Sequence, residues 1–161
     1  MSLYQGPSFT DGKVSLGAVD LDELRAAVSD PDVAGEKERW SREAVTRADI
    51  VYFSVRRGSD LVGQFFLHDI DEQHEEALLG YHLYESRLRA LGIGTSALRL
   101  VQRYVVEQTA LKRIVAITGR DNLPSRRMCA RCGFVEIGRS REDPEKSVAL
   151  QWQVPARAEC C

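Results

Sequence analysis

The clearest alternation of apolar and polar positions lies in the middle of the chain. Residues 78–84 form a short run rich in Leu and Tyr, which is typical of a strand. After a basic stretch with two glycines, apolar residues recur every three or four positions from Ala97 to Val105. This spacing predicts a helix that begins near Gly94 or Thr95. A strand, a glycine-containing turn and a long helix are therefore expected here.

Shorter patterns on both sides of this unit predict further elements. In chain order we expect a strand over 13–19, helices over 21–29 and 36–48, strands over 50–56, 61–69 and 78–84, a helix from 94 or 95, a strand over 113–118, a helix over 124–132, and strands over 134–139 and 147–154. The acidic run 69–76 is expected to be a connection. The strand–helix–strand succession requires a parallel crossover, whereas the hairpins require antiparallel pairing. We therefore expect an α/β (mixed α+β) domain with a mixed sheet and helices on both faces.

Gly92 and Gly94 lie at the mouth of the predicted central helix, and glycine allows a backbone to approach a ligand closely. The first N–H groups of a helix have no partner within it, and the helix dipole makes this end attractive to anions. Arg87 and Arg89 add two positive charges just before the helix. The sequence therefore predicts a phosphate or diphosphate site at the start of this helix.

Length and charge narrow the class of protein. With 161 residues the chain is expected to form one domain, 1–161, with 1–10 as a disordered or cloning-derived lead-in and 156–161 as a tail. The net charge of −2 gives no general attraction to nucleic acid. No apolar run approaches the roughly 20 residues that a membrane helix needs, and the first residues do not resemble a signal peptide. We therefore expect a cytoplasmic protein without nucleic-acid or membrane partners.

The four cysteines raise the question of a metal or redox site. Cys129 and Cys132 form a single C-x-x-C within a predicted helix, while Cys160 and Cys161 are adjacent at the end of the chain. A structural zinc site needs four well-spaced ligands, and a thioredoxin-type motif follows a strand. We therefore expect reduced thiols and no bound metal.

The central glycines also fit the dinucleotide-binding pattern G-x-G-x-x-A over residues 92–97, with Asp121 where a ribose-binding acid would be expected. That pattern normally places its first glycine directly after a strand and opens a domain with several further strand–helix units. Here residues 87–91 intervene, and three predicted strands come first. An NAD-type site is therefore the less favoured interpretation.

Three segments together resemble a known family. The segment 89–94 has the form R-x-x-G-x-G, which resembles the R/Q-x-x-G-x-G/A signature of the GCN5-related N-acetyltransferases (GNAT), which bind acetyl-coenzyme A. The segment L-G-Y-H-L at 79–83 is similar to the strand before that signature in the RimJ/RimL-like subgroup, which acetylates ribosomal-protein N-termini. N-x-x-S at 122–125 followed by C-G-F at 132–134 resembles the end of that subgroup's motif. The resemblance is strongest over residues 77–138.

The resemblance implies the GNAT fold, a mixed and mostly antiparallel sheet of six to seven strands whose central parallel pair, here about 77–84 and 113–118, splays apart. The pantetheine arm of the co-substrate acetyl-CoA would lie in that gap, and its diphosphate on backbone N–H groups at the start of the helix. The residues that the resemblance assigns to acetyl-CoA binding are Leu83, Tyr84, Arg89, Ala90, Leu91, Gly92, Ile93, Gly94, Thr95, Asn122 and Ser125.

Acetylation of an amine requires removal of an amine proton and protonation of the leaving thiolate. Many family members use a tyrosine as the acid, but the matching position here is Cys129. Ser125 is therefore expected either to donate this proton or to act as a cofactor contact or helix residue. Glu76 is the expected base, although Leu78 aligns best with the family's carboxylate and a chain of waters could replace it.

The implied activity is direct transfer of an acetyl group from acetyl-CoA to a primary amine in a ternary complex. The acceptor would be a protein N-terminus or a small amine, and the enzyme a monomer or homodimer. The missing tyrosine leaves an alternative of another class, a catalytically weak module that binds or senses acyl-CoA.

Overall fold

The computed structural model describes residues 3–20, 22–23, 47–84, 88 and 91–156 of the chain. Its elements are β1 (Phe9–Thr10), β2 (Ser15–Gly17), β3 (Val51–Arg57), β4 (Asp60–Asp71), β5 (Glu76–Leu83), α4 (Ile93–Gln108), β6 (Arg113–Gly119), α5 (Leu123–Arg131), β7 (Val135–Arg139) and β8 (Ser147–Gln153). The helices expected over 21–29 and 36–48 fall, apart from their ends, outside the described residues. The later elements lie close to their expected bounds.

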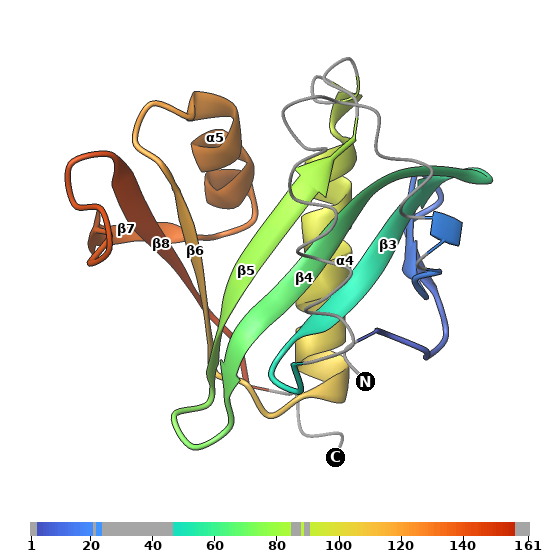
Figure 1. Ribbon diagram of the computed structural model, residues 1–161, viewed down its shortest axis with the longest axis horizontal. Helices are drawn as coiled ribbons and strands as arrows, with labels where there is room; N and C mark the ends of the chain where they lie inside the picture. Colours follow the sequence, from blue (N-terminus) through green and yellow to red (C-terminus); the bar gives the residue numbers. More distant parts are fainter. Residues whose placement is uncertain (1–2, 21, 24–46, 85–87, 89–90, 157–161) are drawn as a thin grey trace.

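The strands of the described residues form one eight-stranded sheet in the order β1-β2-β3-β4-β5-β6-β8-β7. β5 and β6 pair in parallel, and the other neighbours pair antiparallel. The expected mixed, mostly antiparallel sheet is confirmed, with eight strands instead of six or seven because β1 is a separate short strand. Figure 1 shows α4 lying along β3, β4 and β5, and α5 beside β6. None of the helices described has the length and apolar character to cross a membrane.

The N-terminal hairpin differs from the single strand predicted over 13–19. The chain forms two short antiparallel strands, β1 and β2. In the turn between them, Asp11 Oδ1 accepts hydrogen bonds from the N–H groups of Lys13 and Val14 at 2.8 and 2.9 Å. Gly12 adopts a positive φ of 88° there. A turn held by a side chain leaves no hydrophobic periodicity to read, which explains the error.

Aromatic rings hold the first described residues in place. The Tyr4 N–H donates to the Tyr52 carbonyl at 3.0 Å, which attaches the chain start to β3. The Tyr4 ring centroid lies 4.9 Å from that of Phe53 and 5.6 Å from that of Tyr104 on α4. Tyr4, in the lead-in that was expected to be disordered or cloning-derived, is therefore packed against the sheet and α4.

The acidic run that was predicted as a connection is mostly strand. β4 continues to Asp71, which pairs with Glu76 at the start of β5, so that only 72–75 form the turn. The Asp71 carboxylate accepts a hydrogen bond from the His74 N–H at 3.0 Å and stabilises this turn. Charged side chains at a hairpin end project into water while the backbone stays paired, so acidity alone does not end a strand.

The parallel pair separates part of the way along its length. β5 and β6 pair from Glu76↔Arg113 to Leu79↔Ala116 and no further. Beyond that point β5 stays paired with β4, and β6 stays paired with β8 as far as Gly119. The two strands consequently diverge, as Figure 1 shows, and the splay expected from the family resemblance is confirmed. We call the space between the diverging ends of β5 and β6 the gap.

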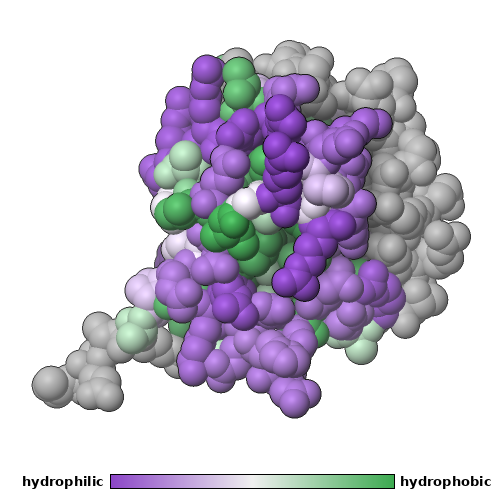
Figure 2. All heavy atoms as spheres, turned by 90° about the vertical axis from the view of Figure 1, so that its left-hand side faces the viewer, coloured by the Kyte–Doolittle hydropathy of each residue, from purple (hydrophilic) through white to green (hydrophobic). Residues whose placement is uncertain are grey.

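The sheet ends at β7, whose five residues are all exposed. Val135 and Ile137 are 65% and 56% exposed, and Figure 2 shows apolar side chains within a mostly hydrophilic surface on this side of the molecule. The ladder with β8 is interrupted by a register shift between Glu136 and Gly138. A bulge and flanking charges such as Arg139 oppose edge-to-edge pairing with another sheet.

Candidate active site

The N-terminus of α4 follows the end of β5 along the chain and begins at a glycine. Gly92 is the N-cap, with φ 72° and ψ 12°, and no side chain in the described part of the chain caps it. The first helical hydrogen bond runs from the Ser96 N–H to the Gly92 carbonyl at 3.1 Å. The N–H groups of Ile93, Gly94 and Thr95 come before it and have no helical partner. This end of α4 therefore offers three backbone donors and the positive end of the helix dipole to an anion.

The structure explains why glycine is required at both Gly92 and Gly94. A Cβ on Gly94 would lie 2.7 Å from Met128 Sδ of α5, which is closer than real Cβ contacts. Gly92 has a positive φ that other residues adopt only at a cost. The two glycines thus let α4 begin close to α5. Of the predicted contacts nearby, Arg89 and Ala90 lie outside the described residues.

Sequence reasoning missed a cation at this helix end. A Cβ on Gly92 would lie 2.9 Å from Lys13 Nζ, so the Lys13 ammonium stands beside the mouth of α4. Lys13 lies in the turn between β1 and β2, where the Asp11 carboxylate accepts hydrogen bonds from the Lys13 and Val14 N–H groups. The hydrogen bond from the Val14 N–H is the main reason that the pKa of Asp11 is lowered. Nothing local in the sequence links residue 13 to residue 92, so only the fold reveals this contact.

The backbone of β5 has one edge on β4 and the other on the gap. The Tyr84 N–H donates to the Val62 carbonyl of β4 at 3.0 Å, and its hydroxyl donates to Gln64 Oε1 at 3.0 Å. Because backbone groups of successive strand residues point to opposite edges, those of Leu83 point toward the gap. Of the two residues predicted to pair with pantetheine, Leu83 is the one with groups directed there. Leu91, just before α4, is 44% exposed.

Hydroxyl groups from both diverging strands meet at the first turn of α5. Ser125 is buried there, and its N–H donates to Asn122 Oδ1 at 3.2 Å, so Asn122 caps the helix. The Ser125 hydroxyl accepts a hydrogen bond from the Thr118 hydroxyl of β6 at 2.9 Å. It is also hydrogen-bonded to the Tyr81 hydroxyl of β5. The Ser125 hydroxyl is therefore held between side chains from both diverging strands.

Cys129, at the position of the family's tyrosine, is fully buried, and the Tyr81 hydroxyl is close enough to influence the pKa of its thiol. Burial raises the pKa of the Cys129 thiol to about 11, and burial also raises the pKa of Tyr81 above its ordinary value. Both groups therefore carry their protons at neutral pH. Sequence reasoning missed Tyr81 because its hydrogen bond to Ser125 joins residues 44 positions apart. The lack of a tyrosine at position 129 was the one hint that a phenol from another element could lie there.

Glu76 lies at the start of β5 and is held by an ion pair. Its Oε2 atom accepts hydrogen bonds from Arg113 Nε and Nη2 at 2.9 and 2.6 Å. The last residue of β5 that pairs with β6, Leu79, is three positions further on, or about 10 Å along a strand. A carboxylate at this distance from the gap can reach a bound amine only through water.

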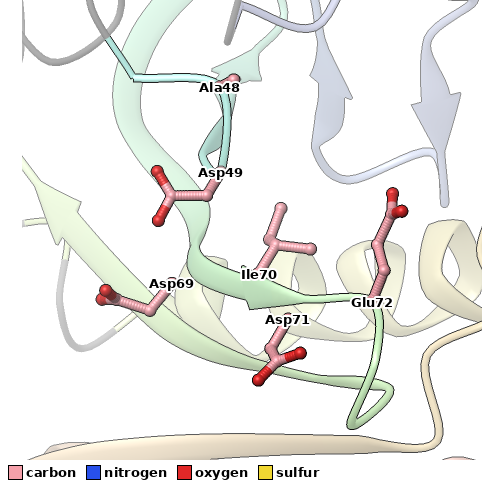
Figure 3. A pocket seen from close by; sticks show the side chains of 6 residues that line it. All are labelled: Ala48, Asp49, Asp69, Ile70, Asp71 and Glu72. Carbon is pink, nitrogen blue, oxygen red and sulfur yellow. The ribbon is translucent and has the colours of Figure 1, made fainter.

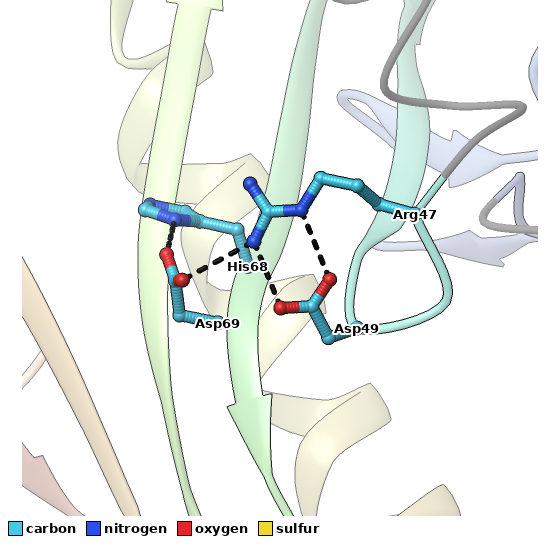
Figure 4. Close-up of polar contacts among 4 residues, drawn as sticks. All are labelled: Arg47, Asp49, His68 and Asp69. Atoms are coloured by element: carbon cyan, nitrogen blue, oxygen red, sulfur yellow. Dashed lines mark hydrogen bonds and ion pairs between the residues drawn. The ribbon is translucent and has the colours of Figure 1, made fainter.

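A hollow of about 630 Å³ lies at the other end of β5. It is lined by Ala48, Asp49, Asp69, Ile70, Asp71 and Glu72, and Figure 3 shows its carboxylates. Arg47 bridges Asp49 at 2.8 Å and Asp69 at 3.2 Å, while His68 Nδ1 lies 2.6 Å from Asp69, as Figure 4 shows. β5 is eight residues long, so this acidic hollow is about 25 Å of strand from the end of β5 that precedes α4. It does not line the site at the start of α4.

An uncapped helix start and two diverging strands are the arrangement that the family resemblance implies for binding acetyl-CoA. The family described as "Acetyltransferase (GNAT) domain" matches residues 15–135. The chain therefore belongs to the GNAT acetyltransferase family, whose acetyl donor is acetyl-CoA, and the resemblance found in the sequence is confirmed.

Individual relatives agree with this assignment. YdaF of Bacillus subtilis (strain 168), named as a ribosomal N-acetyltransferase, is 32% identical over 103 residues, which are 64% of this chain and 55% of YdaF. The chain thus spans about half the length of this curated relative. Mycobacterium smegmatis RimJ in complex with CoA-disulfide has a TM-score of 0.72 at 20% identity, with 92% of this chain and 86% of RimJ covered. A dodecameric spermidine N-acetyltransferase from Vibrio cholerae has a TM-score of 0.72 at 15% identity, with 89% and 95% covered.

Proposed function

We propose that this chain moves the acetyl group of acetyl-CoA directly to a primary amine in a ternary complex. The observation that carries the proposal is the uncapped N-terminus of α4 beside the gap, which suits a diphosphate joined to an extended pantetheine arm. In this proposal the cofactor contacts are Leu83, Tyr84, Arg89, Ala90, Leu91, Gly92, Ile93, Gly94, Thr95, Asn122 and Ser125.

The chemistry follows from these positions. The amine nitrogen bonds to the thioester carbonyl carbon, the carbon–sulfur bond breaks, and one proton leaves the amine while one reaches the sulfur. Backbone N–H groups of β5 in the gap are suited to stabilise the oxyanion, an effect of about 3 kcal/mol in other enzymes. Ser125 is the proposed proton donor to sulfur, and Glu76 the proposed base acting through water.

The proposed acceptor is a protein N-terminus, which the ribosomal names of YdaF and RimJ favour. The spermidine acetyltransferase among the structural neighbours favours a polyamine as the second candidate. The location that suits both proposed acceptors is the cytoplasm, where ribosomal proteins and polyamines occur together with acetyl-CoA.

Thiol release from acetyl-CoA across a panel of amines tests the proposal. The panel contains peptides with the N-termini of ribosomal proteins, spermidine and lysine. Saturable release with one class of amine is the expected result. Calorimetric binding of acetyl-CoA without turnover on any amine would instead favour the binding or sensing module, whereas binding of NAD alone would contradict the family's ligand.

Lys13→Gln is expected to weaken binding of acetyl-CoA roughly tenfold, because it removes an ammonium beside the proposed diphosphate site. The loss should shrink at high salt, since exposed charges are screened. Titration calorimetry at two salt concentrations measures both effects. Lys112→Gln is the matched control, because Lys112 pairs with Glu75 at 2.8 Å at the hairpin end of β5. Equal affinities of the two variants for acetyl-CoA would show that Lys13 does not contribute to the diphosphate site.

Glu76→Gln is expected to lower kcat/KM about tenfold at neutral pH and less at alkaline pH. The reason is that an α-amine with a pKa of about 8 loses its proton without a base once the pH exceeds this value. Initial rates across this pH range measure the effect, with the neighbouring Glu75→Gln as control. A rate equal to that of the wild type at neutral pH would show that the Arg113 ion pair is structural and that bulk water removes the proton.

A further inference from the structure

Three hydroxyl groups from three elements converge beside the gap. Tyr81 comes from β5, Thr118 from β6 and Ser125 from α5, and both strand residues lie beyond the last β5–β6 pair, Leu79↔Ala116. The Thr118 hydroxyl donates to Ser125 Oγ at 2.9 Å, and the Tyr81 hydroxyl is hydrogen-bonded to the same oxygen. Ser125 is therefore the centre of this group.

The hydrogen-bonding capacity of a serine limits how this group can be arranged. A hydroxyl oxygen accepts two hydrogen bonds and donates one. Thr118 uses one acceptor position of Ser125. Either hydroxyl can be the donor in the Tyr81–Ser125 bond, and the neutral phenol that burial favours is able to fill the second position. When Tyr81 is the donor, both acceptor positions are filled and the Ser125 proton points to another acceptor.

We propose that Tyr81 positions the Ser125 hydroxyl so that its proton points at the sulfur of the leaving thiolate, in place of the tyrosine that the family carries at position 129. This inference rests on the acetyl transfer proposed above. When the carbon–sulfur bond breaks, the sulfur takes the Ser125 proton. Ser125 then regains the proton that the amine has released to solvent, so the step needs no other reagent. Tyr81 keeps its own proton and acts as a positioning residue.

The packing around Tyr81 explains why the phenol beside Ser125 comes from β5 and not from position 129 on α5. The Tyr81 ring stacks on Phe65 with centroids 5.1 Å apart and planes inclined by 21°, which fixes the direction of its hydroxyl. Cys129 is 0% exposed and lies near that hydroxyl. A tyrosine at 129 would meet the Tyr81 hydroxyl in this space. The small side chain of Cys129 therefore leaves the space that the Tyr81 hydroxyl occupies.

A cycle of four proteins tests the inference: wild type, Tyr81→Phe, Ser125→Ala and the double variant. Tyr81→Phe keeps the ring stacked on Phe65 and removes only the hydroxyl. Its kcat at saturating acetyl-CoA is expected to fall about tenfold, with KM for acetyl-CoA within about twofold of the wild type. In the Ser125→Ala background the same change should have no further effect, because a residue that acts only through Ser125 is not additive with it. If Tyr81→Phe lowered kcat through a structural change independent of Ser125, the fold-changes of the two single variants would multiply in the double variant.

Tyr104→Phe is the matched control, since it removes a partly buried phenol that packs on Phe53 away from the gap, and it should leave kcat unchanged. If Tyr81→Phe yields too little folded protein, Thr118→Val removes the other donor to Ser125 and should also lower kcat. An unchanged kcat in Tyr81→Phe, or losses that multiply in the double variant, would overturn this inference alone. Binding of acetyl-CoA without turnover by the wild type would overturn the proposed function as well.

Discussion

Replacing Gly94 with glutamate is expected to lower the affinity for acetyl-CoA by about 100-fold or more. The new carboxylate would stand in the first turn of α4, beside the N–H groups of Ile93 and Thr95, where it repels a diphosphate and competes for its donors. Its Cβ would also lie 2.7 Å from Met128 Sδ, so the Met128 side chain has to move. Titration calorimetry with acetyl-CoA measures the loss.

Controls separate this effect from unfolding. An acid in the first turn stabilises a helix by about 0.3–1 kcal/mol, which offsets part of the steric cost, so the melting temperature should change little. Gly94→Gln adds similar volume without charge and should lose less affinity. Gln108→Glu adds the same charge at the exposed C-terminal end of α4 and should bind as the wild type does. Unchanged affinity in Gly94→Glu would place the diphosphate elsewhere.

The sequence was most informative where a long segment has one clear period. α4 carries buried residues at helical spacing from Ile93 to Val105, and its first residue lies within two positions of the expected start. β6 is a β-branched run that is half buried, and it was predicted almost to the residue. The hairpin of β1 and β2 was missed because strands of two and three residues have no measurable period.

Contacts between distant segments could not be read in the same way. Lys13 approaches Gly92, and Tyr81 reaches Ser125, only after the sheet has formed. The motif at the start of α4 was visible because a helix N-terminus and its glycines are local features. The groups that complete the site come from other elements, and their positions follow from strand register, which a single sequence does not specify.

Replacing Ser125 with alanine is expected to lower kcat by about 100-fold while KM for acetyl-CoA changes little. The hydroxyl is buried beside the gap, accepts a hydrogen bond from Thr118 and has its own proton available for the thiolate. The helix should still form, because the bond that Asn122 makes goes to the Ser125 N–H and survives the change. Initial rates at saturating amine, with acetyl-CoA varied, separate kcat from KM.

Ser140→Ala is the matched control, because Ser140 is also a buried serine but its hydroxyl accepts a bond from the Glu142 N–H in the connection between β7 and β8. Removal of the Ser140 hydroxyl should leave kcat unchanged. The alternatives for Ser125 give different signatures. A contact that only binds the cofactor would raise KM and leave kcat intact, whereas a hydroxyl that only supports α5 would lower the melting temperature without changing either constant. A selective fall in kcat is the result that a proton donor requires, since protonation of the thiolate matters in the transition state and not in the ground-state complex.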